Sequence, residues 1–358
     1  MITPCKIICK RRQGVGPVAV QPSKIKLRKT SREDALTQEF LRSAASPVCQ
    51  SEFDVMNVTQ MSVLLFFIDG LGIGSRGPQN PLDGLVGAEP LAIFKDEAPV
   101  TIHDGVVVST DACLGVEGRP QSASGQTTIL TGVNVPAQLG YHKQGFPNSA
   151  MLEILREHSI FLQLNRAGIK PITFANTYTQ GFFADRPRWV SATTAAMEAA
   201  GVPFRRVADL KAGRAVFHDF TNAALIERNE DVALRTAEEA ATVLARIAAE
   251  NRFTLYEYFL TDKVGHSQEL EKAQVLLLNL AKLVRELLKQ IDLSRTSVIL
   301  TSDHGNIEDL STRNHTLNLV PTLVWGTHKE RVAKRIKSLA DITPAIVETL
   351  TAEPSTDT

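Results

Sequence analysis

A short apolar segment that ends in an acid and an imidazole constrains the fold of this chain most. Residues 297–301 are rich in β-branched and apolar side chains, follow a helical pattern and lead into Asp303, His304 and Gly305. A run of this length between a helix and a glycine turn is typical of a buried parallel strand. Open α/β sheets carry their functional groups after the carboxyl ends of such strands. The segment therefore predicts an α/β protein with a polar site at the end of this strand.

Two other predicted strands also end beside candidate metal ligands. Residues 62–68 lead into Asp69 and a glycine-rich turn, and residues 254–260 lead into Asp262 and His266. An acid and a histidine four residues apart, beside a glycine, can both face one cation. Each segment alone fits an ordinary strand-end turn or a turn-capping acid equally well. Because three segments offer matching ligands, together they favour a shared metal site.

Ser122 stands at the start of a predicted helix. Small residues follow it, and the helical sequence Thr-Thr-Ile-Leu lies behind them. The free N–H groups and the dipole of a helix N-terminus favour an anion or an oxyanion. Ser122 is therefore a candidate nucleophile, and the alternative is that it only caps the helix.

The composition argues against several classes of partner. The chain has 358 residues, 43% of them hydrophobic, and its 39 basic side chains balance 39 acidic ones. A formal charge of zero gives no overall field that would attract nucleic acid or anionic lipid. The longest apolar runs fall far short of the roughly 18 residues that a membrane span needs. We therefore expect a globular cytoplasmic protein without a nucleic-acid or membrane partner, and its oligomeric state stays open.

The first 60 residues differ from the remainder. They hold ten Lys or Arg against five Asp or Glu, without sustained apolar periodicity. Such a segment cannot bury much surface, so we expect residues 1–60 to be a disordered extension, with a basic arm for an anionic partner as the alternative. Residues 61–350 are expected to form the folded domain and residues 351–358 a tail. Three of the four cysteines lie in the extension, which makes a disulfide framework unlikely.

The remaining segments are predicted to be connecting strands and covering helices. We expect strands at 105–109, 171–175, 214–219 and 319–326, and helices at 150–167, 191–200, 234–248 and 270–291. Pro321 indicates an edge strand or the first residues of a strand. A last helix is expected to have Thr343 as its N-cap and Pro344 in its first turn.

Three basic residues are candidate substrate ligands. Lys143, Arg186 and Arg188 lie in loop-like segments flanked by aromatic residues. Such side chains can hold a phosphate or a carboxylate. The alternative is that each is simply solvated at the surface.

The order of these motifs along the chain resembles the alkaline phosphatase superfamily. Within it, the chain is similar to the metalloenzyme branch that contains cofactor-independent phosphoglycerate mutase and phosphopentomutase. The segments that carry the resemblance are Phe67-Ile-Asp69-Gly70, Asp262-Lys-Val-Gly-His266, Thr301-Ser-Asp303-His304-Gly-Asn306 and Asn314-His315. The resemblance implies a three-layer fold with a mostly parallel central sheet, helices on both faces and a small inserted cap within about residues 133–230.

The resemblance also implies two divalent cations, Mn²⁺ or Zn²⁺, held by two groups of ligands. The first group would be Asp262, His266 and His315. The second would be Asp69, Asp303, His304 and the oxygen of Ser122. In this superfamily the nucleophile lies ten residues before a glycine that closes a helix, which Ser122 and Gly132 match; Ser124 is the second candidate.

The activity implied is phosphoryl transfer from a small phosphate ester through a phosphoserine. Related mutases carry a sizeable second domain, whereas the interval 133–261 has only 129 residues here, so we expect a phosphohydrolase. A phosphomutase of the two types named above, or a phosphodiesterase, is the alternative, and a non-catalytic metal-binding relative is a further one. Sulfatases of the usual motif are set aside, because Ser124 and Gln126 replace their proline and arginine.

Overall fold

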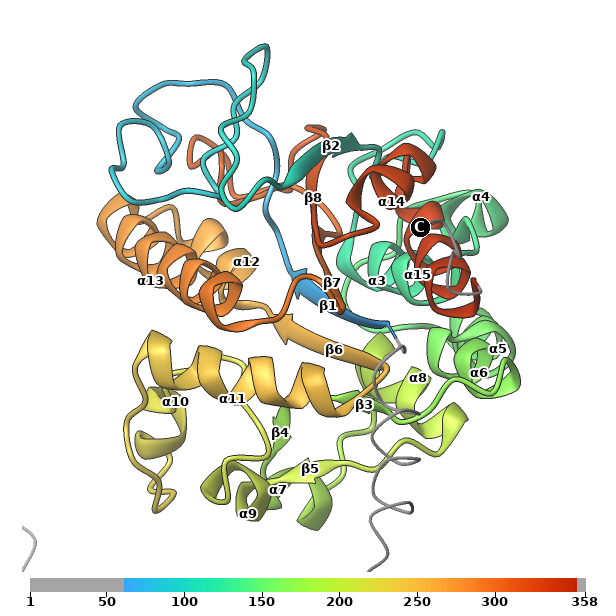
Figure 1. The fold of residues 1–358 in the computed structure, drawn as a ribbon. Coiled ribbons are helices and arrows are strands. Elements are labelled where there is room, and N and C mark those ends of the chain that lie inside the picture. The colour runs from blue at the N-terminus through green and yellow to red at the C-terminus, as the bar shows by residue number, and fades with distance from the viewer. Residues whose placement is uncertain (1–60, 353–358) are drawn as a thin grey trace, which may run out of the picture. The chain divides into compact units, whose positions relative to one another are not determined.

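A six-stranded sheet forms the centre of the computed structural model, which describes residues 61–352 (Figure 1). Its strands are β1 (Ser62–Ile68), β2 (Val106–Thr110), β3 (Ile172–Phe174), β6 (Phe253–Tyr258), β7 (Thr296–Ser302) and β8 (Val320–Trp325). They lie in the order β2-β8-β7-β1-β6-β3. β7, β1, β6 and β3 are parallel, and β8 is antiparallel to both of its neighbours. The mostly parallel sheet predicted from the sequence is confirmed.

The central strand β1 is buried on both faces, which explains its uninterrupted apolar sequence. Its even-numbered side chains enter one hydrophobic core and its odd-numbered ones enter the other. This alternation follows from the two-residue repeat of a strand. Helices cover both faces, as predicted, and Figure 1 shows them on either side of β1.

Two sets of helices supply the outer layers. The first core is covered by α11 (Ala237–Glu250) and α13 (Leu270–Gln290), with α12 (Leu260–Ser267) beside them. The second is covered by α3 (Ser122–Thr131), α5 (Ser149–His158), α6 (Ile160–Arg166), α8 (Ala192–Ala200), α14 (Lys329–Arg335), a 3₁₀ turn (Leu339–Asp341) and α15 (Ile342–Thr351). Among the helices between residues 61 and 352, none has the length and apolarity that crossing a bilayer requires.

A small second sheet lies in the region where the cap was expected. It consists of β4 (Thr177–Tyr178) and β5 (Arg205–Arg206), and the short helices α7 (Gln180–Ala184), α9 (Val207–Lys211) and α10 (Ala223–Ile226) come from the same region. One more short helix, α4 (Val135–Leu139), follows α3. Much of the interval 133–230 nevertheless packs on the main sheet, because α5, α6 and α8 contribute to the second core. The part that could form a cap, the β4–β5 sheet with its short helices, therefore occupies only a portion of the interval 133–230.

Two predictions about helices were wrong in detail. Residues 150–167 are two helices, because Ser159 is the C-cap of α5 and the N-cap of α6. Thr343 does not cap the last helix, since its hydroxyl donates to the carbonyl oxygen of Ile129 at 2.6 Å. Pro344 does lie in the first turn of α15, as expected.

One prediction about strands was wrong, and the structure distinguishes the two alternatives given for Pro321. Residues 214–219 form no strand; Val216 makes an isolated bridge with Asn176, and its neighbours pack in a small core beside α9 and α10. β8 is not an edge strand, because it pairs with both β2 and β7. Pro321 is tolerated since pairing with β7 begins only at Leu323, so it belongs to the first residues of the strand.

Candidate metal centre and nucleophile

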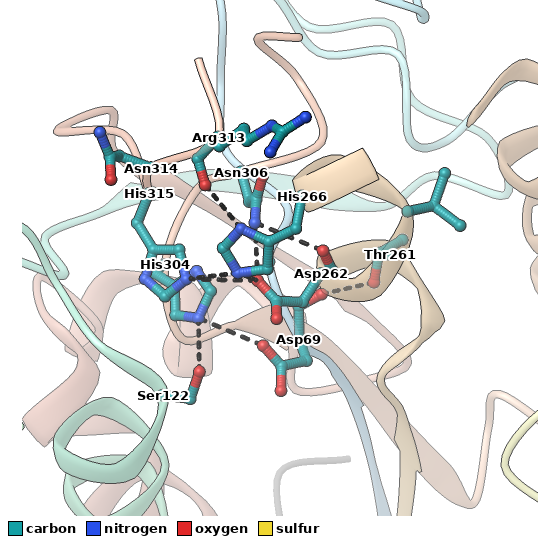
Figure 2. Close-up of polar contacts among 12 residues, drawn as sticks. Asp69, Ser122, Thr261, Asp262, His266, His304, Asn306, Arg313, Asn314 and His315 are labelled. Carbon is teal, nitrogen blue, oxygen red and sulfur yellow. Dashed lines mark hydrogen bonds and ion pairs between the residues drawn. The ribbon is translucent and has the colours of Figure 1, made fainter. Parts of the chain in front are cut away.

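The candidate site lies where the parallel strands end. Ile68, Ser302 and Tyr258 are paired in register on three adjacent strands, so the residues that follow them emerge at one edge of the sheet. Asp69 follows the first and Asp303 the second. α12 begins two residues after β6 and carries the third group of ligands, and the N-terminus of α3 and the loop before β8 complete the site (Figure 2).

The first group of side chains forms an equilateral triangle. Asp262 and His266 share one turn of α12, and His315 comes from the loop before β8. The distances from Asp262 Oδ1 to His266 Nε2 and to His315 Nε2, and between the two imidazole nitrogens, are all 3.3 Å. In a tetrahedron with metal–ligand bonds of about 2.0 Å, ligand atoms lie about 3.3 Å apart. The triangle therefore has the dimensions of one face of a tetrahedral metal site.

The other nitrogens of these two histidines set their protonation. His266 Nδ1 lies 2.6 Å from the carbonyl oxygen of Arg313, and His315 Nδ1 lies 2.9 Å from that of Pro120. A carbonyl only accepts, so each Nδ1 must carry the proton. In the neutral rings the Nε2 lone pairs then point at each other and at a carboxylate, an arrangement that a cation satisfies. The first group fits a divalent metal.

The second group converges on His304. Its Nε2 lies 2.9 Å from Ser122 Oγ, 3.2 Å from Asp69 Oδ1 and 3.6 Å from Asp303 Oδ2. Gln126 Nε2 donates to Asp69 Oδ2 at 3.0 Å and to Asp303 Oδ2 at 3.2 Å. Asp69 Oδ1 is buried and accepts no hydrogen bond from the residues described. The second group therefore also fits a divalent cation. It offers two buried carboxylates, an imidazole and a hydroxyl, and one carboxylate oxygen has no hydrogen-bond donor among the residues described.

The two groups are neighbours. The rings of His304 and His315 stack with their centroids 3.6 Å apart and an angle of 11° between their planes. Figure 2 shows Ser122 below the two rings, and Asp262 and His266 to their right. A pair of cations in the two groups would therefore lie side by side, with Ser122 next to the second.

Three acids, Asp69, Asp262 and Asp303, lie close together at the site, and few positive charges lie near them. Burial raises the pKa of Asp303 well above its usual range and raises that of Asp69. Burial also acts to lower the pKa of His304, but Asp303 and Asp69 outweigh it and raise that pKa to about 10. For Asp262, burial is outweighed by the histidines and Asn306, which lower its pKa to about 2. Without metal, the imidazolium of His304 thus supplies the positive charge.

We predict that the metal-free protein loses stability as the pH rises from about 6.5 to about 10. His304 has a pKa of about 10 when folded and 6.5 as a free side chain, so in this window the folded state binds more protons than the unfolded state. The free energy of unfolding must then fall with rising pH. Urea unfolding in EDTA at pH 6, 8 and 9.5 measures this slope. His304→Asn should flatten it and the exposed control His158→Asn should not; a stability that rises across the window would contradict the assignment.

Glu308 ties together the loops that carry the two groups. The side chain is 1% exposed and accepts four hydrogen bonds. Oε2 accepts from the backbone N–H of Gly72, at 2.9 Å, and of Asn306, at 2.7 Å. Oε1 accepts from Thr316 Oγ1 at 2.5 Å and Asn318 Nδ2 at 3.0 Å. One carboxylate therefore fixes the segments that follow Asp69, His304 and His315.

Glu308→Gln is expected to lower both thermal stability and metal binding. An amide nitrogen must replace one carboxylate oxygen, so it would face two donors that can no longer be satisfied, at a cost of about 1–3 kcal/mol for each buried donor. Thermal unfolding and metal content after dialysis measure the effect, with Glu271→Gln on the exposed face of α13 as the matched control. Equal melting temperatures for the two variants would rule out this role.

Gly305 is needed for space and not for an unusual backbone angle. Its φ is not in the left-handed region. A Cβ at this position would instead collide with the side chains of Glu308 and Thr316. Gly70 is the residue at this edge of the sheet that does adopt a left-handed conformation, with φ of 79°.

The three predicted basic substrate ligands do not gather at the site. Arg186 pairs with Glu198 at 2.6 Å, and the guanidinium of Arg188 lies over the ring of Trp189. Lys143 Nζ donates to the carbonyl oxygen of Gln144. None of these three lines the cavity of about 490 Å³ that opens beside Ser122. Ser124, the second candidate nucleophile, is fully buried, with its hydroxyl bonded to the backbone of Gln121 and Lys143.

Sequence reasoning missed three residues that shape the site. Gln126 follows Ser122 by four residues and therefore shares its helix face, which is a signal that could have identified it. Asn306 donates to Asp262 Oδ1 at 2.7 Å, and it directly follows the Asp-His-Gly triplet. Glu308 has no local signature, because its partner Gly72 lies 236 residues away in the chain.

Comparisons with known proteins agree with this geometry. Residues 196–354 match the model of the Metalloenzyme superfamily. The 2,3-bisphosphoglycerate-independent phosphoglycerate mutase of Mycoplasmopsis synoviae is 27% identical over 126 residues, which cover 34% of this chain and 25% of the mutase. The match thus spans about a quarter of the length of that relative.

Two solved structures are also similar. The PH0037 protein from Pyrococcus horikoshii aligns with a TM-score of 0.48 and 13% identity, over 83% of this chain and 99% of that one. The alkaline phosphatase from the Antarctic bacterium TAB5 aligns with a TM-score of 0.41 and 13% identity, over 82% and 99%. The segment matched by the family model carries every acid and histidine of the two groups except Asp69. Residues 196–354 of the chain thus match the Metalloenzyme superfamily, and part of the chain is similar to the 2,3-bisphosphoglycerate-independent phosphoglycerate mutases.

Proposed function

We propose that this protein is a metal-dependent phosphohydrolase that cleaves a small phosphate monoester through a phosphoserine on Ser122. The observation that carries the proposal is the position of Ser122 Oγ, 2.9 Å from His304 Nε2 at the first turn of a buried helix. A serine hydroxyl in this position faces a group of acids and imidazoles suited to a cation. It also lies at the end of α3 where the helix dipole favours a phosphate.

Two divalent cations would occupy the two groups of ligands. Asp262, His266 and His315 would hold one, and Asp69, Asp303, His304 and Ser122 Oγ the other. When bound, such cations activate a hydroxyl as nucleophile and neutralise charge on phosphoryl oxygens. Carboxylates with neutral imidazoles suit Zn²⁺ or Mn²⁺.

The residues of the chain then divide the reaction into two displacements. Ser122 Oγ forms a bond to phosphorus as the bond to the alcohol oxygen breaks, and the alcohol leaves with a proton. Water attacks the phosphoserine, the bond from phosphorus to Ser122 Oγ breaks, and inorganic phosphate is released. Gln126 would hold the carboxylates of Asp69 and Asp303 in place during both steps.

Hydrolysis is favoured over a mutase reaction by the composition of the cavity and by the small size of the second sheet. A mutase must retain a phosphate-bearing intermediate while it reorients, which calls for several basic side chains. Lys263 is the one lysine or arginine among the residues that line the cavity beside Ser122.

The test is turnover of p-nitrophenyl phosphate and of its bis ester with added Mn²⁺ or Zn²⁺. Release of phosphate from the monoester alone supports the proposal. Faster cleavage of the bis ester would identify a phosphodiesterase, and interconversion of phosphoglycerates without phosphate release would identify a mutase. Protein that binds both cations and turns over none of these compounds would be a non-catalytic relative.

A further inference from the structure

The cavity beside Ser122 has two unlike ends. At one end lie Asp69, Ser122 and Asp262, where the phosphoryl group would bind. The other end is lined by aromatic rings, among them Phe174, Tyr178 and Phe259, and by Glu257 and His218. None of the residues at this second end has been given a role in the chemistry. Their composition therefore describes the part of the substrate that is not phosphate.

Glu257 is the acidic side chain at that second end. It lies on β6, is 8% exposed and lines the cavity. Asn176 holds the backbone of Glu257 in place, because its Oδ1 accepts from the backbone N–H of Glu257 at 3.0 Å and its Nδ2 donates to the carbonyl oxygen at 2.7 Å. Burial raises the pKa of the Glu257 carboxyl group to about 7, and this group offers a hydrogen-bond acceptor to a ligand.

The histidine at this end is an aromatic surface and not a cation. His218 packs between Phe217 and Phe259, with ring centroids 4.1 and 4.2 Å away. Burial lowers its pKa to about 4, so the ring is neutral at neutral pH. Its Nδ1 has no hydrogen-bond partner among the described residues. The ring thus extends the aromatic lining and leaves one polar atom unpaired.

Positive charge is scarce around the cavity. Lys263 is exposed and follows Asp262 on α12, whereas Arg186 contacts Glu198 and Arg188 contacts Trp189. An anionic group at the aromatic end would face Glu257 without an arginine to pair with it. The cavity therefore disfavours a substrate with a second acidic group.

We infer that this cavity selects phosphate monoesters of an uncharged alcohol that carries an aromatic ring, with Glu257 accepting a hydrogen bond from that ring or its substituents. The inference rests on the proposed function and names its substrate class. Nucleoside and pyridoxine monophosphates have this chemistry, because each joins a flat ring with donor groups to a phosphorylated hydroxymethyl group. Phosphoglycerates do not have this chemistry, since the alcohol they contain carries a carboxylate and no aromatic ring.

The first experiment compares kcat/KM among adenosine 5′-phosphate, pyridoxine 5′-phosphate, p-nitrophenyl phosphate and 3-phosphoglycerate with the metal-loaded protein. We expect at least one of the first two to exceed 3-phosphoglycerate by about tenfold or more. Glu257→Leu should lower the kcat/KM of that ester relative to p-nitrophenyl phosphate by about tenfold, the effect of one hydrogen bond to a buried carboxyl group. Glu153→Gln on the exposed surface of α5 is the control and should leave the ratio unchanged.

A second measurement does not depend on turnover. Calorimetry with metal-free protein should detect binding of adenosine or pyridoxine, weakened by Glu257→Leu, and no binding of glycerate. If no ester is cleaved but the ring-bearing alcohol binds, the proposed function fails and the substrate class stands. Preferential cleavage of 3-phosphoglycerate, or binding of glycerate in place of both ring compounds, would overturn the inference. Near-ultraviolet circular dichroism confirms that the variant is folded.

Discussion

Replacing Ser122 by alanine is expected to reduce phosphoryl transfer by at least about a thousandfold while bound metal stays near its normal amount. In the proposed mechanism the side chain would supply the attacking oxygen, and no other described hydroxyl at the site would replace it. Asp69, Asp303 and His304 remain to hold the second cation, and the first group of ligands is untouched. Turnover of a monoester and elemental analysis of the dialysed protein measure the two quantities.

Ser124→Ala is the matched control for this variant. Ser124 Oγ contacts only the backbone of Gln121 and Lys143 in the hydrogen bonds described, so its loss should cost stability of about 1–2 kcal/mol and not remove the nucleophile. Radiolabelled phosphate from a substrate should remain on the wild-type protein after acid quench, and on Ser124→Ala, but not on Ser122→Ala. Wild-type turnover by Ser122→Ala would remove this serine from the mechanism.

Replacing His315 by alanine should remove one of the two metal equivalents and lower activity by more than about a hundredfold. Changes in groups that merely orient a ligand already weaken metal binding by 10–100-fold, and a ligand itself matters more. The change also frees the carbonyl oxygen of Pro120, two residues before Ser122, from its 2.9 Å hydrogen bond. Elemental analysis and calorimetric titration with Zn²⁺ or Mn²⁺ measure the loss.

His142→Ala is the control for the histidine variant. Its Nε2 contacts the carbonyl oxygen of Val116 at 3.2 Å, and it belongs to neither ligand group. This variant should bind both equivalents. Two tightly bound equivalents in His315→Ala would show that the triangle of 3.3 Å contacts does not hold a cation.

Much of the fold was predictable because its central strands are buried on both faces. The apolar runs that became β1 and β7 end at Asp69 and Asp303, and any parallel pairing in register brings such residues together. The strand predicted at residues 214–219 was wrong, because side chains that favour strands can equally fill a small core outside the sheet. Ser159 shows the same limit for helices, since one serine can end a helix and begin the next.

The candidate site was predictable only where the spacing of the candidate ligands in the local sequence indicates a shared position. Asp262 and His266 have helical spacing, and Asp303 and His304 are adjacent. Glu308 could not be found this way, because its function as an acceptor depends on backbone groups brought together by folding. The basic residues failed for the opposite reason, since Arg186 had a nearer partner in Glu198.

The anchoring of three loops on Glu308 has a consequence for how metals are acquired. The four hydrogen bonds to this carboxylate involve backbone and side-chain groups and no cation, so the coordinating loops hold their shape in the apoprotein. If the two groups hold metals, ions would then be exchanged without refolding, and each ion would meet a cage of fixed dimensions. Which metal occupies the protein in a cell would thus follow the local supply of ions of suitable radius.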